Sequence, residues 1–256
     1  MAGPRHRGGC APMHRLLAAA VLVLAVLVGV GPAAAAEFLV LAVSWQPAFC
    51  ETRPEKPECT SQTEDRFDAS HFALHGLWPQ PRENVYCDVP AAVRNLDEAG
   101  RWQALPALAL TEATRAALDR MMPGSRSALD RHEWIKHGSC YSADAERYFA
   151  DSLRLLDELN RSAVRDLFTG AIGEALSARD IRAAFDEAFG DGAGRRVHVA
   201  CRRVGFRRLI VELTVNLAGP ITADRGLATL LRDAPVHYEG CPAGIVDRVG
   251  TGLVDP

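Results

Sequence analysis

The stretch HEWIKHGSC, residues 132–140, places two histidines, a glutamate and a lysine close together. Zinc proteases use a related pattern, H-E-x-x-H, in which two imidazoles four residues apart on a helix face one metal ion. Here the fourth position is Lys136, and the second imidazole follows one residue later, at His137. On a regular helix His132 and His137 would lie about 140° apart, so they cannot easily share a metal. The stretch is therefore either a solvated, ion-paired helix face or a site for metal-independent chemistry.

The charge state of His137 can be anticipated from its place at the end of this helix. The helix dipole favours a positive charge in the last turn, and Glu133 favours it too, whereas Lys136 opposes it. We therefore expect His137 to take up a proton near neutral or mildly acidic pH.

A second histidine stretch, HFALHGLWPQ at residues 71–80, reads as a strand with His75 near its end. Gly76 follows directly, and Trp78 and Pro79 hold a large aromatic ring at a turn. A core histidine and a core tryptophan are the alternative interpretation. Because a buried imidazole needs partners for its ring nitrogens, two such stretches in one chain favour a functional site.

The first 36 residues have the order of a secretory signal peptide. Arginines precede the apolar run Leu16–Val30, and the small residues of Gly31–Ala36 precede Glu37. A membrane anchor is the alternative, but it would need about 20 apolar residues. We expect cleavage after Ala36, leaving one domain, residues 37–256. This mature chain would be secreted or periplasmic, without stable membrane association, and we expect a monomer.

The net charge limits the class of binding partner, and the cysteine content indicates the redox compartment. The leader contains three arginines and no acid, so its removal changes the net charge from −3 to −6. An acidic total does not favour a nucleic-acid partner, so any anion-binding surface must be local. The mature chain keeps an even number of cysteines, which in an exported protein predicts disulfides, whereas zinc ligation would need other spacings. They are Cys50, Cys59, Cys87, Cys140, Cys201 and Cys241.

The order of expected elements predicts an α+β fold. Two strands come first, at Phe38–Gln46 and Ser70–Pro79. Four helices follow, at Thr111–Met122, Ser125–Gly138, Ser142–Asn160 and Ser177–Gly190. The last third alternates apolar and polar residues in RRVHVACR and FRRLIVELTVN, as half-buried strands do, with a turn near Gly205. We expect a mainly antiparallel sheet flanked by several helices.

Together, HGLWP and HEWIKHGSC resemble the two active-site segments of the ribonuclease T2 family. The first strand, VLAVSWQPAFC, the MPG at Met122–Gly124 and the helix RDIRAAFDEAFG resemble its bacterial periplasmic ribonuclease I type. The resemblance extends over nearly the whole mature chain, from about Phe38 to about Val249. It implies a disulfide-stapled α+β fold and a metal-independent, cofactor-free endoribonuclease that acts on single-stranded RNA with broad base tolerance.

The family pattern assigns roles to individual residues. It makes His137 the general base and His75 the general acid for attack of the ribose 2′-OH on the adjacent phosphorus, which yields a 2′,3′-cyclic phosphate. Glu133 and Lys136 match the pair that stabilises the pentacoordinate state, and His132 matches a phosphate-holding histidine. Trp78 matches an aromatic ring that stacks on a base. The residues alone do not say which imidazole starts protonated.

The resemblance also implies the disulfides Cys50–Cys59, Cys87–Cys140 and Cys201–Cys241. One position departs from the pattern: many members have aspartate directly after HGLWP, and here it is Gln80. Because an amide both donates and accepts hydrogen bonds, the base preference cannot be carried over. The sequence identifies neither the physiological RNA nor an inhibitor. The three remaining mature-chain histidines, His71, His198 and His237, match no catalytic position and are expected to be structural.

Two other functions fit parts of the pattern. A zinc peptidase would use His132, Glu133 and a further ligand, and its hydrolysis would stop in EDTA. A secreted, non-catalytic binding protein, such as an inactive RNA carrier, would not need the complete set of three histidines, Glu133 and Lys136. These alternatives differ from a ribonuclease in whether RNA becomes acid-soluble and whether His137→Ala stops this.

Overall fold

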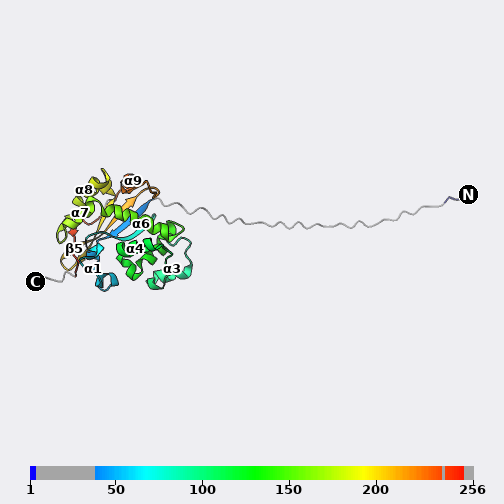
Figure 1. Cartoon of the computed structure of the whole chain (residues 1–256). Helices are drawn as coiled ribbons and strands as arrows, with labels where there is room; N and C mark the ends of the chain where they lie inside the picture. The colour runs from blue at the N-terminus through cyan, green and yellow to red at the C-terminus, as the bar shows by residue number, and fades with distance from the viewer. Residues whose placement is uncertain (4–37, 238–239, 251–256) are drawn as a thin grey trace. The chain divides into compact units, whose positions relative to one another are not determined.

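A mainly antiparallel sheet lies at the centre of the unit Ala35–Pro256 (Figure 1). The computed structural model describes residues 1–3, 38–237 and 240–250, so the expected signal peptide lies almost wholly outside the described residues. The strands are β1 (Leu39–Ser44), β2 (Ala73–Pro79), β3 (Ala175–Ser177), β4 (Val197–Val204), β5 (Arg207–Leu217) and β6 (Ala243–Ile245). They follow the order β2-β1-β5-β6-β3, with β4 also paired to β5.

The strand register explains why the long C-terminal strand matters to the site. β5 pairs antiparallel with both β1 and β4, whereas its contact with β6 is parallel. β1 also pairs antiparallel with β2, so β1 lies between β2 and β5. Side chains on one face of β2 and β5 can therefore meet across β1. The predicted α+β class is confirmed.

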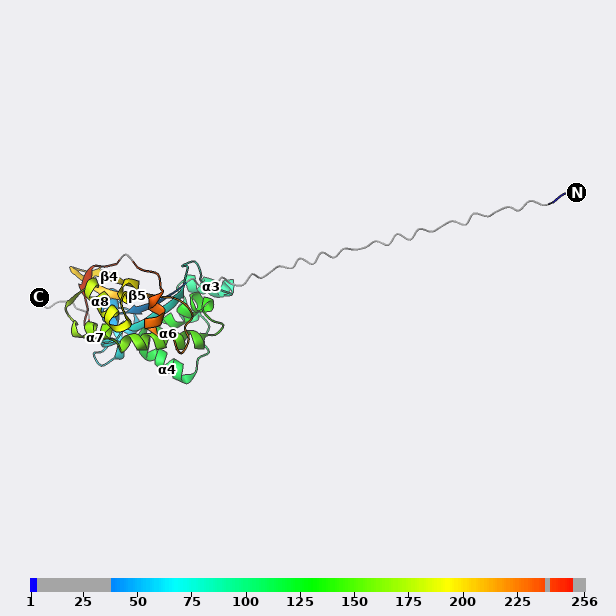
Figure 2. The ribbon, with the colours of Figure 1, turned by 90° about the horizontal axis from the view of Figure 1, so that it is seen from above.

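Helices surround the sheet and come mainly from the middle of the chain. They are α1 (Gln46–Thr52), α2 (Pro57–Thr60), α3 (Ala91–Glu98), α4 (Glu112–Met121), α5 (Leu129–Lys136), α6 (Ala145–Asn160), α7 (Ala163–Gly170), α8 (Ala178–Phe189) and α9 (Leu227–Arg232). In Figures 1 and 2, α3 lies at the opposite end of the unit from α7 and α8. The predicted cap at Ser177 is present, because its side chain accepts a hydrogen bond from the Asp180 backbone N–H.

A continuous apolar core packs the helices against the sheet. Trp45 is fully buried, with its ring 5.6 Å from that of Phe72 and 5.3 Å from that of Phe168. Its indole N–H donates to the backbone oxygen of Asp247, 2.7 Å away, which ties the start of the fold to its end. Replacing such a ring by alanine costs about 3–5 kcal/mol. This core makes the strand β2 and the helix α5 a rigid support for the side chains described below.

The predicted helix over Ser125–Gly138 is partly wrong. A 3₁₀ turn spans Pro123–Ser127, and Ala128 then adopts a left-handed backbone with φ of 60° before α5 begins at Leu129. Helix α5 has no side-chain cap, so Ser125 is not its N-cap. Gly138 begins another 3₁₀ turn, where an added Cβ would lie 2.5 Å from the Trp134 ring. The glycine therefore permits a close approach of backbone and ring.

Three disulfides join the cysteines in the pairs that the resemblance implies: Cys50–Cys59, Cys87–Cys140 and Cys201–Cys241. The second joins the loop before α3 to the turn after α5. The backbone N–H of Tyr86 also donates to the Lys136 carbonyl, 2.8 Å away. The end of α5 is thus held by a covalent bond and a hydrogen bond. Within the part of the chain that the structure describes, no helix is long and apolar enough to cross a membrane.

Candidate active site

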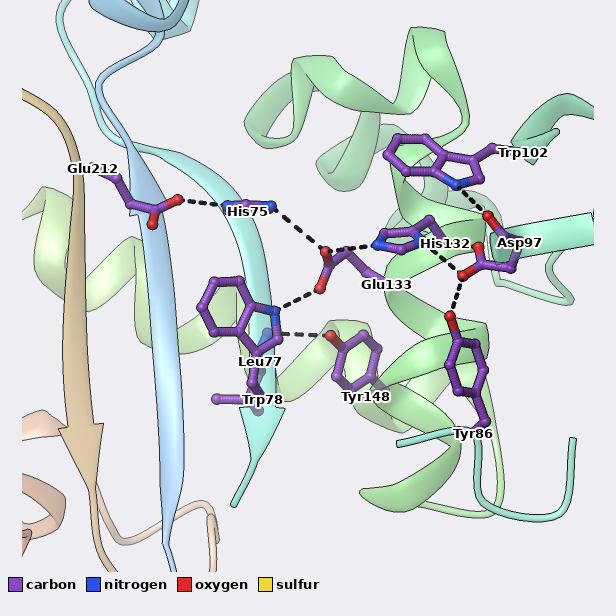
Figure 3. A network of polar contacts seen from close by, with 10 residues as sticks. All are labelled: His75, Leu77, Trp78, Tyr86, Asp97, Trp102, His132, Glu133, Tyr148 and Glu212. Atoms are coloured by element: carbon purple, nitrogen blue, oxygen red, sulfur yellow. Dashed lines mark hydrogen bonds and ion pairs between the residues drawn. The ribbon is translucent and has the colours of Figure 1, made fainter. Parts of the chain in front are cut away.

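Carboxylates and imidazoles alternate along a row that crosses from the sheet to the helices. In Figure 3 the order is Glu212, His75, Glu133, His132 and Asp97. The five side chains come from β5, β2, α5 and α3. The structure therefore brings both histidine stretches into one site, together with two acids that the sequence analysis did not single out.

His75 lies between two carboxylates. Its Nδ1 is 2.5 Å from Oε2 of Glu212, and its Nε2 is 3.6 Å from Oε1 of Glu133. Burial opposes the charged form, but the hydrogen bond to Glu212 and the charges of Glu133 and Glu212 outweigh it and raise the pKa of His75 to about 9. His75 is therefore an imidazolium at neutral pH, although its side chain keeps 32% exposure.

Glu133 occupies the middle of the row and is only 1% exposed. Its Oε2 accepts a hydrogen bond from the Trp78 indole, 2.7 Å away. Burial raises the pKa of this carboxyl, while the charges of His75 and His132 work in the opposite direction. An added Cβ at Gly76 would lie 2.0 Å from Glu133 Oε2, so only glycine leaves room for this carboxylate beside β2.

His132 is held by a second cluster, on the other side of Glu133. Its Nδ1 lies 2.8 Å and 3.0 Å from the two carboxylate oxygens of Asp97, and its ring stacks on Trp102 with centroids 4.2 Å apart. The Tyr86 hydroxyl donates to Asp97 as well, at 2.8 Å (Figure 3). These contacts leave Nε2 of His132 directed toward Glu133, 3.9 Å from Oε1. The imidazole is therefore fixed in orientation before any substrate arrives.

His137 follows the last residue of α5 and has different surroundings. Its ring lies 5.6 Å from Trp78, and the His75 ring lies 5.1 Å from the same indole. Its Nδ1 is buried and has no hydrogen-bond partner among the described residues. Burial and the charges of Lys136, His132 and His75 lower the pKa of His137 to about 3. The expectation that His137 takes up a proton near neutral pH is therefore wrong, because burial and three cations outweigh the helix dipole.

The two imidazoles that flank Trp78 consequently start in opposite states. At neutral pH His75 can give a proton and His137 can accept one. Lys136 stands at the end of α5 and lowers the pKa of both histidines through its charge. The side chain of Gln80 donates to the Trp78 carbonyl, 3.3 Å away, so it supports the turn that holds the indole.

A pocket of about 390 Å³ opens beside His75. His75 and Trp102 line it, together with three basic side chains and two acids: Arg53, Lys56, Arg202, Glu58 and Glu212. Lys56 also lies over the Trp102 ring, 5.4 Å from its centroid. The pocket is therefore locally cationic and aromatic, although the chain as a whole is acidic.

Glu212, Asp97 and Trp102 are the functional residues that sequence reasoning missed. Glu212 belongs to the alternating strand FRRLIVELTVN, where an exposed-face acid is ordinary. No signal in the sequence pointed to Glu212, because it meets His75 only through the pairing of β1 with both β5 and β2. Asp97 and Trp102 lie in and after a short helix with no motif, so only the fold brings them to His132.

The remaining three histidines lie outside the row, and the described residues contain no ligand set typical of a metal site. In residues 38–237 and 240–250, no group of three or more His, Cys, Asp or Glu side chains is arranged to hold a metal ion. His71 stacks on Phe67 with centroids 4.2 Å apart, and its Nδ1 lies 3.0 Å from the Phe67 carbonyl. His198 and His237 lie with their rings 5.6 Å apart. These three histidines take no part in the row.

Comparison with known proteins links this geometry to one family. The profile of the Ribonuclease T2 family matches residues 36–219. The Escherichia coli protein Ribonuclease I is 33% identical over 199 residues, which are 70% of this chain and 74% of that protein. Ribonuclease 1 of Arabidopsis thaliana is 27% identical over 157 residues, or 60% of this chain and 65% of the relative. The crystal structure of Japanese pear S3-RNase matches with a TM-score of 0.53 at 16% identity, over 82% of this chain and 98% of that one, which shows a shared fold.

Proposed function

Since the chain belongs to the ribonuclease T2 family and is an RNA-cleaving endoribonuclease, we propose that it cuts single-stranded RNA by metal-independent transphosphorylation. The reaction needs a base for the ribose 2′-OH, an acid for the 5′-oxygen that leaves, and stabilisation of the charge that grows on the phosphoryl oxygens. The row of side chains and His137 contain a candidate for each task.

The reaction begins with proton transfer to the neutral imidazole. His137 removes the proton from the 2′-OH, and the 2′-oxygen attacks the adjacent phosphorus. As the bond from phosphorus to the 5′-oxygen breaks, His75 transfers its proton to that oxygen. The products are a 2′,3′-cyclic phosphate and a free 5′-OH, His75 is left neutral and His137 is left charged. Proton exchange with water restores the starting states.

Three further side chains support the pentacoordinate state. Lys136 supplies a positive charge near both imidazoles, His132 holds a phosphoryl oxygen through the ring nitrogen that Asp97 leaves free, and Glu133 keeps the neighbouring rings in place. Trp78 contacts both imidazoles and offers an indole for a base.

One observation carries the proposal: the rings of His75 and His137 flank one indole and have pKa values shifted in opposite directions. A charged acid and a neutral base are the states in which general acid–base catalysis at neutral pH begins. Two histidines with only a structural role would not need pKa values shifted in opposite directions.

Product analysis of a dinucleotide tests the mechanism. We expect a 2′,3′-cyclic phosphate and a nucleoside with a free 5′-OH in the presence of EDTA, and no cleavage of the matching deoxydinucleotide, which lacks the nucleophile. Loss of cleavage in EDTA would indicate a metal-dependent nuclease and contradict the metal-independent mechanism. Cleavage of DNA at a rate comparable to that of RNA would refute attack by the 2′-OH.

The proposal includes export and a broad base preference. We propose that residues 1–36 are a signal peptide, that residues 37–256 form a monomeric catalytic domain, and that the mature enzyme is secreted or periplasmic. N-terminal sequencing of the exported protein should begin at Glu37, and sedimentation should give the mass of one chain. The resemblance implies broad base tolerance, and because Gln80 stands where many members have aspartate, no particular base preference can be carried over. Cleavage rates for the sixteen dinucleotides would reveal one.

A further inference from the structure

The strands β4 and β5, labelled in Figure 2, form a hairpin. Its turn is rich in arginine and carries an exposed aromatic ring. Residues 201–208 contain four arginines and no acid. Gly205 has a φ of 57°, and the turn it begins presents Phe206 at 103% exposure. In the described part of the chain, the only other large apolar side chain so exposed is Met1. We call residues 201–208 the basic hairpin.

The fold itself does not account for these charges. Arg203 and Arg208 face each other directly across the two strands, an arrangement of like charges that weakens a hairpin. Arg207 is neutralised by Glu51 and Asp247, at 3.1 Å and 3.0 Å. Within the described residues, the side chains of three other arginines have no ion pair or hydrogen bond: Arg202, Arg203 and Arg208. An anionic partner outside the chain would balance them.

The basic hairpin is continuous with the candidate active site. Arg202 lines the pocket that contains His75 and Glu212. It also lines a second hollow with Arg203 and Arg208, beside the Cys201–Cys241 disulfide. Arg202 thus lines both hollows, so cationic side chains are present in the pocket at His75 and in the hollow of the basic hairpin. The disulfide fixes the base of the hairpin.

We infer that the RNA strand on the 3′ side of the scissile phosphate passes along the basic hairpin, where arginines bind its phosphates and Phe206 stacks on a base. The inference rests on the proposed function, because the direction of the strand comes from the chemistry. His75 protonates the 5′-oxygen of the leaving nucleoside, and that nucleoside begins the 3′ segment. Since the pocket and the hairpin lie on the His75 side, they receive this segment.

Single-stranded RNA fits this surface better than a membrane does. Arginines bind phosphates, and an exposed aromatic ring stacks on any base, which suits an enzyme without a strong base preference. An anionic lipid surface could also attract arginines and a phenyl ring. It would not explain why the cations continue into the pocket that holds His75.

Three oligonucleotides test the direction of the strand. Each contains a single ribonucleotide in a deoxyribonucleotide background, so each has one cleavable bond. One is a dinucleotide, one carries five extra nucleotides on the 5′ side, and one carries five on the 3′ side. For the wild-type enzyme we expect the 3′ extension to raise kcat/KM about tenfold, mainly through KM, and the 5′ extension to change it much less.

Variants of the hairpin should remove this gain. For Arg203→Ala with Arg208→Ala we expect loss of most of the gain, and a salt dependence of log KM that is shallower by about 1.4 for two lost phosphate contacts. For the substrate with the 3′ extension, Phe206→Ala and Phe206→Leu should both lower kcat/KM about tenfold. Phe206→Trp should keep the gain because its ring still stacks on a base. A matched control is Arg161→Ala with Arg179→Ala, which removes the same charge from exposed side chains that line neither hollow.

The outcomes separate this inference from the proposed function. If the wild type cleaves no ribonucleotide-containing substrate, the proposed function fails. If it cleaves all three substrates with equal kcat/KM, or gains only from the 5′ extension, the proposed function stands and the hairpin path is wrong. The path is also wrong if Phe206→Ala keeps the gain but no longer sediments with phosphatidylglycerol vesicles that bind the wild type, because the surface then serves a membrane.

Discussion

The end of β2 and the end of α5 each present one histidine to the same indole, yet they give these histidines opposite charge states. His75 lies between Glu212 and Glu133, and its pKa is raised to about 9. His137 lacks a hydrogen-bond partner for its buried Nδ1 among the described residues, and its pKa is lowered to about 3. The two side chains are chemically identical, so the difference comes from what the strand and the helix end place around them.

The comparison shows that burial and neighbouring charges together outweigh the position of a residue on its helix. A helix C-terminus favours an imidazolium by at most about 2 kcal/mol, even in favourable geometry. Burial and the positive charges of Lys136, His132 and His75 together exceed this at His137. At His75 burial acts in the same direction, but two carboxylates reverse it. The acids of the row therefore decide which imidazole is the acid and which is the base.

Removing the neutral member of the pair should have the largest effect. We expect His137→Ala to lower kcat by about 10²–10⁴-fold, since the 2′-OH loses its base. The measurement is the release of cyclic phosphate from a dinucleotide at pH 6, where wild-type His137 is neutral.

Two controls make this result interpretable. His71→Ala removes a histidine that stacks on Phe67 outside the row, and it should keep near wild-type kcat. The circular dichroism spectrum and Tm of His137→Ala should show that the fold is retained. A folded variant with undiminished activity would exclude His137 as the base.

Glu212→Gln sharpens the comparison by removing one of the two acids beside His75 while preserving the shape of the side chain. The pKa of His75 is raised, so its charged, active form predominates below about 9 and is lost as the pH rises through that value. Without the Glu212 charge the pKa falls, and the basic limb of the profile of kcat against pH moves to lower pH. We expect roughly tenfold less activity at pH 8 and little change at pH 5.

Glu58→Gln is the matched control for this pH profile. Glu58 lines the same pocket, but its carboxylate accepts a hydrogen bond from Ser127 and not from His75. The apparent pKa of the basic limb should therefore stay in place. Equal loss of activity at pH 5 and pH 8 in Glu212→Gln would indicate a structural role for Glu212 and contradict a role in keeping His75 charged.

Much of the fold followed from local sequence rules. The helices α4, α6 and α8 begin and end within three residues of their predicted bounds, because their apolar spacing and their caps at Thr111, Asp144 and Ser177 agree. Helix α5 was misjudged because its start depends on the strained Ala128 backbone, and no local residue pattern encodes that turn. The short strands β3 and β6 form only because distant segments pair.

In the site, residues within short motifs could be predicted from the sequence, whereas their partners from distant parts of the chain could not. HGLWP and HEWIKH are short motifs, so His75, Trp78, Glu133 and His137 could be identified by resemblance. The partner of His75 lies 137 positions later in the chain, and the partner of His132 lies 35 positions earlier. Such contacts depend on tertiary packing. The pKa of His137 was mispredicted for this reason, since its main cause is burial.

Asp97→Asn extends the comparison to His132, which also touches two carboxylates. The amide can still hydrogen-bond to Nδ1, but it removes the negative charge that holds the ring nitrogen at 2.8 Å. We expect KM to rise about tenfold with a smaller change in kcat, in keeping with the loss of one charge-assisted contact. Asp130→Asn is the control. Asp130 is a buried carboxylate on α5, the helix of His132, and it pairs with Arg115 instead of a histidine. It should lower Tm and leave KM unchanged, and an equal KM change in both variants would argue against a specific role for Asp97.

The smallest effect expected is on folding stability, and it should have opposite signs for the two histidines. The pKa of His137 is lowered in the folded state, so only the unfolded chain takes up this proton, and stability is lost as the pH falls below about 6.5. His75 has a raised pKa, so its contribution is present below about 6.5 and is lost as the pH rises through about 9. Relative to wild type, His137→Phe should therefore lose about 1 kcal/mol less between pH 7 and pH 5.5, whereas His75→Phe should lose less between pH 7 and pH 9. Urea unfolding at pH 5.5, 7 and 9 measures both differences. The same sign for both variants would mean that the strand and the helix end do not hold their histidines in opposite charge states.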